Sequence, residues 1–115
     1  MLWYEPIQDK LHEDEDSQVA DGKKLNLGGK YASVTLQVIG TMTDASIEFE
    51  GSIDGENYHS LEGIDLSDGS EVTESGGNTG IFRVNIVGIN YFRAKKTGSN
   101  TEPITVIAVV SPAAA

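Results

Sequence analysis

Apolar and polar residues alternate along most of the chain after residue 21, and this period of two predicts β-strands rather than helices. In the segment 31–39, one face of the predicted strand carries Val34, Leu36 and Val38, and the other carries Thr35 and Gln37. Turns rich in Gly, Asn and Asp separate such segments at short intervals. The pattern therefore predicts short antiparallel strands with one face in a core and one face in water.

The segment 46–53 alternates in the same way and ends at a turn signal. Its predicted core face carries Ile47, Phe49, Gly51 and Ile53, and its predicted wet face carries Ser46, Glu48, Glu50 and Ser52. In the turn that follows, Asp54 is expected to accept hydrogen bonds from the backbone and Gly55 to supply a positive φ. Residues 58–61 would return as the second arm of a hairpin, with Tyr58 packing over it.

The remaining predicted strands lie at residues 24–27, near Val72 within a loop over 62–78, and at 81–87, 91–97 and 104–111. Residues 106–110 are almost continuously apolar, so we expect this strand to be buried on both faces. Seven to nine short strands without a helix predict an antiparallel β-sandwich of jelly-roll or Greek-key type. A closed barrel is the alternative, because periodicity does not separate the two architectures.

The first 21 residues have a different composition. They hold seven acidic residues against one Lys, which is −6 of the net charge of −10. We predict an acidic, extended N-terminal arm over residues 1–21 and a sandwich domain over residues 22–112. The arm starts with the most aromatic segment of the chain, which includes its single Trp. Trp3, Tyr4 and Ile7 are expected either to fold back on their own domain or to dock on a neighbouring subunit.

Length and charge exclude several classes of protein. A chain of 115 residues forms one domain, and 18 acidic against 8 basic residues repel phosphate backbones and anionic lipids. We therefore expect neither a nucleic-acid nor a membrane partner. Without cysteine the chain has no disulfide or thiol nucleophile. Residues 1–10 have neither a basic n-region nor an apolar h-region, and no stretch approaches an apolar span of membrane length, so we expect a soluble protein made without Sec export.

Catalytic and metal-binding patterns are weak. His12 and His59 are far apart in sequence, and no nucleophile, phosphate-loop or zinc motif occurs. Glu48 and Glu50 share one strand face about 6 to 7 Å apart, but that face is expected to be wet and without a raised pKa. These acids, with Asp54 and the acids of residues 62–74, could ligate Ca²⁺, yet the EF-hand spacing is missing. We predict no enzyme activity, no cofactor and no metal site.

Two stretches resemble a family of small virion proteins of tailed bacteriophages. Residues 48–58 read EFEGSIDGENY, and residues 80–94 read GIFRVNIVGINYFRA. The resemblance implies a β-sandwich building block of a head, tail or baseplate, assembled in the bacterial cytoplasm and located in the virion. It also implies a homo-oligomer that contacts other virion proteins. The S-x-D-G-x-x-Y turn is similar to that of discoidin-type sandwiches as well, although this chain is shorter and has Tyr58 where Trp is usual.

These observations predict a structural component of a phage or prophage virion, such as a capsid decoration, tail or baseplate subunit, that acts through self-association. The alternative is a carbohydrate- or receptor-binding module, with or without Ca²⁺. The candidate interaction residues are Trp3, Tyr4, Ile7, Tyr58, Arg83 and Arg93. Arg83, Arg93 and Lys95 fall on the polar phase of their strands and Lys96 on the other. The basic residues are expected either to pair with Glu48 and Glu50 or to form a stripe that meets a neighbour's acidic arm.

Overall fold

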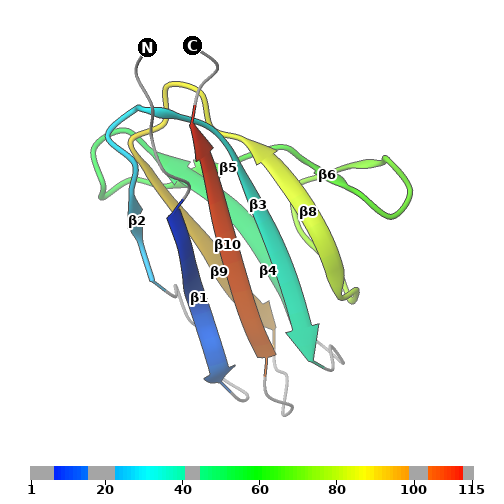
Figure 1. The fold of residues 1–115 in the computed structure, drawn as a ribbon. Helices are drawn as coiled ribbons and strands as arrows, with labels where there is room; N and C mark the ends of the chain where they lie inside the picture. The colour runs from blue at the N-terminus through cyan, green and yellow to red at the C-terminus, as the bar shows by residue number, and fades with distance from the viewer. Residues whose placement is uncertain (1–6, 16–22, 41–44, 99–103, 113–115) are drawn as a thin grey trace.

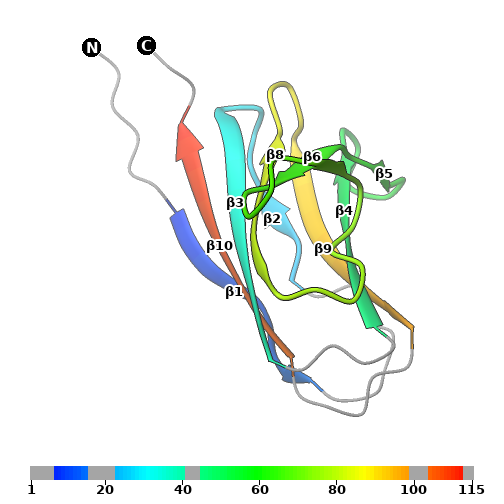
Figure 2. The ribbon, with the colours of Figure 1, turned by 90° about the vertical axis from the view of Figure 1, so that its right-hand side faces the viewer.

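Two antiparallel sheets pack face to face in the computed structural model, which describes residues 23–40, 45–98 and 104–112, and residues 7–15 as backbone (Figures 1 and 2). The six-stranded sheet has the order β1-β10-β3-β8-β6-β7, and the four-stranded sheet has the order β2-β9-β4-β5. The strands are β1 (Ile7–Glu15), β2 (Leu25–Asn26), β3 (Tyr31–Gly40), β4 (Ala45–Ser52), β5 (His59–Ser60), β6 (Gly63–Asp65), β7 (Glu71–Val72), β8 (Gly80–Asn85), β9 (Tyr91–Gly98) and β10 (Ile104–Pro112). The predicted antiparallel sandwich is confirmed, with ten strands instead of seven to nine because the edge strand β1 and the three-residue β6 escape the periodicity.

The core lies between the sheets and is built from the inward phase of the long strands. Phe49 and Phe82 join the two layers, with ring centroids 5.6 Å apart. Each such side chain, fully removed from water, contributes about 1.5 to 3 kcal/mol. Lys96 lies on the same inward phase as Ala94, opposite Ile47, and is fully buried. Its phase was predicted from the sequence.

The end of β4 departs from the predicted alternation. Ile53, expected in the core, is 70% exposed because the strand ends at Ser52 and the chain turns away from the sheet. Glu50 and Ser52, expected in water, are buried. Glu50 is held by Arg93, and the Ser52 hydroxyl is drawn into the following turn.

Strand β10 was expected to be buried on both faces, and this prediction is wrong. Its residues alternate between buried and half-buried positions, because only one face meets the other sheet. β10 is nevertheless an inner strand, hydrogen-bonded to β1 on one side and to β3 on the other. The half-buried face, which includes Ile107 and Val109, belongs to the outside of the six-stranded sheet.

Residues 7–15, which the sequence analysis places in the acidic arm, form the edge strand of the six-stranded sheet. β1 runs antiparallel to β10 from the pair Ile7 and Val110 to the pair Glu15 and Ile104, with register shifts on both sides of His12. This part of the arm is therefore a strand of the sandwich. Trp3 and Tyr4 lie outside the residues that the structure describes.

The chain between β5 and β8 connects the two sheets along one side. β6 pairs with β8 in the six-stranded sheet, whereas the segment after β7 returns to β4 in the four-stranded sheet. There the Phe49 amide donates to the Thr73 carbonyl at 3.1 Å, and the Ile47 amide donates to the Ser75 hydroxyl at 2.9 Å. This edge of β4 is consequently covered by the chain itself.

Candidate interaction surfaces

The turn after β4 is fixed by the Asp54 carboxylate. Its Oδ1 accepts hydrogen bonds from the backbone amides of Glu56 and Asn57, both at 2.8 Å, and from the Ser52 hydroxyl at 2.9 Å. The hydrogen bonds from the Asn57 amide, the Glu56 amide and the Asn57 side chain stabilise the ionised carboxylate, and they hold the pKa of Asp54 far below its usual range. Gly55 has φ +79°, and a Cβ there would lie 3.2 Å from the Tyr91 ring. The predicted turn is confirmed, and its carboxylate is occupied by structural hydrogen bonds.

Asn90 joins three connections at one end of the sandwich. Its carbonyl accepts from the Leu27 amide at 2.7 Å and from the Gly28 amide at 3.3 Å. Its own amide donates to the Ser52 carbonyl at 3.2 Å, and its side-chain amide donates to the Ile53 carbonyl at 3.1 Å. The β2–β3, β4–β5 and β8–β9 connections are therefore linked to one another at the upper end of Figure 1, which we call the loop end.

The outward side chains of β4 and β9 form a surface that we call the charged face. Arg93 Nε donates to Glu50 Oε1 at 2.7 Å, and both side chains are largely buried, with 14% and 12% exposed. The Arg93 guanidinium also lies 4.0 Å from the centroid of the Tyr58 ring. The pairing of Arg93 with Glu50 across strands, one of the two expectations from the sequence, is confirmed, and Lys95 lies opposite Glu48 in register.

The outward side chains of β3, β8 and β10 form a second surface, which we call the neutral face. Among these described residues Arg83 is the only charged one, and the others are mostly Ile, Val, Thr and Ser. Four large apolar side chains on or beside this face are between 41% and 44% exposed, namely Ile39, Ile64, Leu66 and Ile81. None of these four residues is among the interaction residues predicted from the sequence, although Ile39 and Ile81 occupy polar-phase positions of their strands.

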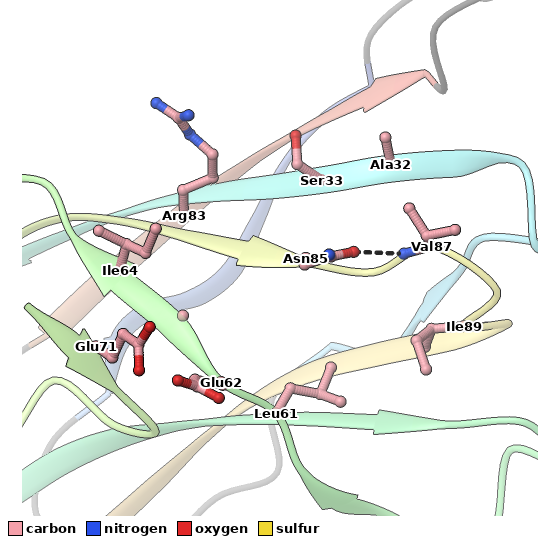
Figure 3. Close-up of a pocket in the computed structure, with 11 residues that line it drawn as sticks. Ala32, Ser33, Leu61, Glu62, Ile64, Glu71, Arg83, Asn85, Val87 and Ile89 are labelled. Atoms are coloured by element: carbon pink, nitrogen blue, oxygen red, sulfur yellow. Dashed lines mark hydrogen bonds between the residues drawn. The ribbon is translucent and has the colours of Figure 1, made fainter. Parts of the chain in front are cut away.

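An open hollow of about 840 Å³ lies beside the neutral face, between the β8–β9 connection and the β6–β7 edge (Figure 3). It is lined by Ala32, Ser33, Leu61, Glu62, Gly63, Ile64, Glu71, Arg83, Asn85, Val87 and Ile89. The Glu62 and Glu71 side chains lie close together at its edge. A hydrogen bond with Glu71 and its negative charge raise the pKa of Glu62. The lining combines aliphatic with polar and charged side chains and includes no aromatic ring.

The structure separates the predicted interaction residues into different surfaces. Tyr58 and Arg93 lie together on the charged face, whereas Arg83 lies on the neutral face of the other sheet. The two arginines cannot form one basic stripe, because β8 and β9 belong to different sheets. Ile7 starts β1 and is paired through its backbone with Val110.

Two further properties concern the described part of the chain. Among residues 23–40, 45–98 and 104–112, the His, Asp and Glu side chains form no group of three that could hold a metal ion. The described ranges also contain no helix of the length and apolarity needed to cross a membrane. Glu48 and Glu50, the acids considered for Ca²⁺ or acid–base chemistry, face Lys95 and Arg93.

Comparison with known proteins identifies relatives of this fold. The SPBc2 prophage-derived protein YomS has a similar structure, with a TM-score of 0.79, 18% identity, and coverage of 96% of this chain and 97% of that chain. The PBSX exported protein XepA has a TM-score of 0.83 and 17% identity over 92% of this chain, but only 37% of XepA is covered. No curated protein sequence matches. The model of the XepA family matches residues 7–106, starting where β1 starts, and the chain therefore belongs to the XepA family.

Proposed function

We propose that this protein is a non-enzymatic structural component of a tailed-phage or prophage particle, and that it acts by associating with copies of itself. The observation that carries this proposal is the neutral face, which exposes apolar side chains in a chain of net charge −10. Exposed apolar surface of this kind marks contact sites. The fold supports the phage association, because it is shared over almost its full length with a protein named as prophage-derived.

The described carboxylates and arginines support a structural role. Asp54 is saturated by hydrogen bonds of its own turn, and Glu50 is engaged by Arg93. Glu71 raises the pKa of Glu62, but both acids stand at the rim of an open hollow where water is not excluded. General acid catalysis depends on a positioned group near a bound substrate in a shielded site. These groups instead stabilise the fold or face water.

Binding of a glycan, the alternative function, receives less support. A saccharide-binding surface is expected to offer an exposed aromatic ring, and Tyr58 and Tyr91 are the tyrosines beside the Asp54 turn. Arg93 covers one face of the Tyr58 ring, and the Gly55 turn lies against Tyr91. The lining of the hollow beside the neutral face includes no aromatic ring.

The first experiment is size-exclusion chromatography with multi-angle light scattering on the full chain at physiological salt, with and without Ca²⁺. We expect an oligomer of defined mass that Ca²⁺ does not change. A monomer at every concentration, combined with binding on a glycan array, would replace the proposal with a carbohydrate-binding module.

A density gradient of phage particles, probed with an antibody against the chain, tests the proposed location. We expect the protein to sediment with the particles. Because XepA is named an exported protein, the informative contrary result is protein found only in the medium, outside any particle fraction.

A further inference from the structure

Four exposed apolar side chains gather on and beside the neutral face, and we call them the outer patch: Ile39, Ile64, Leu66 and Ile81. They come from three neighbouring parts of the six-stranded sheet. Ile81 lies opposite Gln37 on β3, one alternation from Ile39, and its carbonyl accepts from the Leu66 amide at 3.0 Å. Ile64 lies opposite Arg83 on β8. The patch is therefore continuous and has a cationic group at its border.

The charge at this border is available for a partner. Arg83 is exposed and forms no ion pair with any side chain that the structure describes. Arg93, by contrast, is held between Glu50 and Tyr58. An apolar surface beside one unneutralised cation fits a segment that combines large apolar side chains with a carboxylate.

We propose that the outer patch and Arg83 bind residues 1–6 of a second copy of this chain. The sequence of that segment is Met-Leu-Trp-Tyr-Glu-Pro, so Leu2, Trp3 and Tyr4 would cover the apolar side chains and Glu5 would pair with Arg83. Aromatic anchors beside a charge pair are typical of the residues that dominate binding at interfaces. This inference rests on the self-association proposed above and names the surface and the segment that perform it.

The position of β1 favours a second copy over the same chain. Ile7 lies in one cross-strand row with Val110, Val34 and Val84, so it is three strands away from β8. Along β8, Ile81 is three residues away from this row. At about 4.8 Å between strands and 3.3 Å per residue, Ile7 and Ile81 are roughly 17 Å apart. The four residue steps from Ile7 to Trp3 span at most about 14 Å. β1 also runs from Ile7 toward the level of Ile81, so the preceding residues would have to reverse direction.

Tryptophan fluorescence tests the proposal directly, because Trp3 is the single Trp of the chain. We expect the full-length protein to emit at a short wavelength while it is associated, and at a longer wavelength after dilution, in parallel with the loss of oligomer mass in light scattering. Ile81→Asp and Arg83→Glu should each raise the dissociation constant about tenfold or more. The matched controls are Ile53→Asp, at an exposed isoleucine of the loop end, and Lys95→Glu, on the charged face, and both should leave association unchanged.

Deleting residues 1–6 supplies a second test that keeps β1 and the patch intact. The shortened chain should be monomeric and should melt at the temperature that the full chain shows once it is diluted to a monomer, which separates lost association from lost folding. Far-ultraviolet circular dichroism should show the same fold for all variants.

Three results would overturn the inference. An oligomer that survives both the deletion and Ile81→Asp would place the interface elsewhere and leave the proposed function standing. Short-wavelength emission that persists in a dilute monomer would show docking within one chain. A wild-type protein that is monomeric and absent from particles would remove the proposed function itself.

Discussion

The two outer faces of the sandwich follow the same alternation of side chains but expose different kinds of side chain to solvent. The charged face places its cations opposite its anions across strands, and one of them, Arg93, forms an ion pair with Glu50 and lies over the ring of Tyr58. The neutral face has one charge on three strands and leaves four apolar side chains more than two-fifths exposed. Covering a surface whose charges are already opposed brings little stabilisation. Covering exposed isoleucines with another molecule lowers the free energy, because apolar area is removed from water.

Removal of β1 is expected to have the largest effect, because it uncovers the edge of the sheet that bears the neutral face. Deleting residues 1–15 breaks the hydrogen bonds between β1 and β10 and exposes the unpaired edge of β10. We expect a loss of about 3 to 6 kcal/mol in the free energy of unfolding, given about 1 kcal/mol for each of several hydrogen bonds and the lost packing. Urea unfolding measures the change, and the deletion of residues 1–6 is the control. Equal stability of the two truncated chains would contradict the assignment of β1 to the sandwich.

The charged face should respond unequally to the loss of its two acids. Glu50→Ala leaves the largely buried Arg93 without its carboxylate and should cost about 2 kcal/mol. Glu48→Ala removes a half-buried acid opposite Lys95 and should cost less than about 1 kcal/mol. Chemical denaturation of Glu50→Ala, Glu48→Ala, Arg93→Ala and the double variant Glu50→Ala/Arg93→Ala tests this. If the free energy lost in the double variant equals the sum of the losses in Glu50→Ala and Arg93→Ala, the two side chains are not coupled.

Asp54 should make stability depend on pH at the loop end that both faces share. Its pKa is lowered in the folded protein, so its stabilising effect is complete at neutral pH and is lost as the pH falls below the ordinary Asp value of 3.8. Asp54→Ala should therefore lower the melting temperature at pH 7 and change it less at pH 3. Melting curves of both proteins between pH 2 and 7 provide the measurement. A constant difference over that range would show that hydrogen bonding to the ionised carboxylate is not the cause.

The smallest expected effect concerns the rim of the hollow. Because Glu71 raises the pKa of Glu62, the two acids destabilise the folded protein once both are ionised. Glu71→Gln should slightly raise the melting temperature at pH 7, and the gain should vanish below the ordinary Glu value of 4.5. Glu74→Gln, a nearby exposed acid, serves as the control. A destabilising effect of Glu71→Gln at pH 7 would contradict the repulsion.

The sequence predicts the long strands well because their two faces differ in polarity. The boundaries of β3 and β9 and the Asp54 turn follow from alternation and turn chemistry. β1 escapes prediction because an edge strand needs only backbone donors and acceptors, and its sequence IQDKLHEDE offers little apolar contrast. The burial of Glu50 escapes it because the partner Arg93 lies 43 residues further along the chain, on β9.

The candidate surfaces are harder to predict than the strands. Alternation places Arg83 and Arg93 on polar phases but does not state which sheet each strand joins. That assignment depends on strand order, in which β8 lies beside β3 and β9 lies between β2 and β4. The outer patch likewise depends on neighbours from distant parts of the chain, since Leu66 reaches Ile81 only through the pairing of β6 with β8.

The hydrogen bonds of Asn90 limit how this molecule can diversify. Many β-sandwich proteins vary their loops one at a time, and each loop can lengthen without disturbing the next. Here the backbone and side chain of one residue bind Leu27, Gly28, Ser52 and Ile53 from two other connections. An insertion in any of the three would pull on the other two. We therefore expect changes in the three connections to be correlated during evolution. Adaptation to new binding partners is expected on the charged and neutral faces of the sandwich.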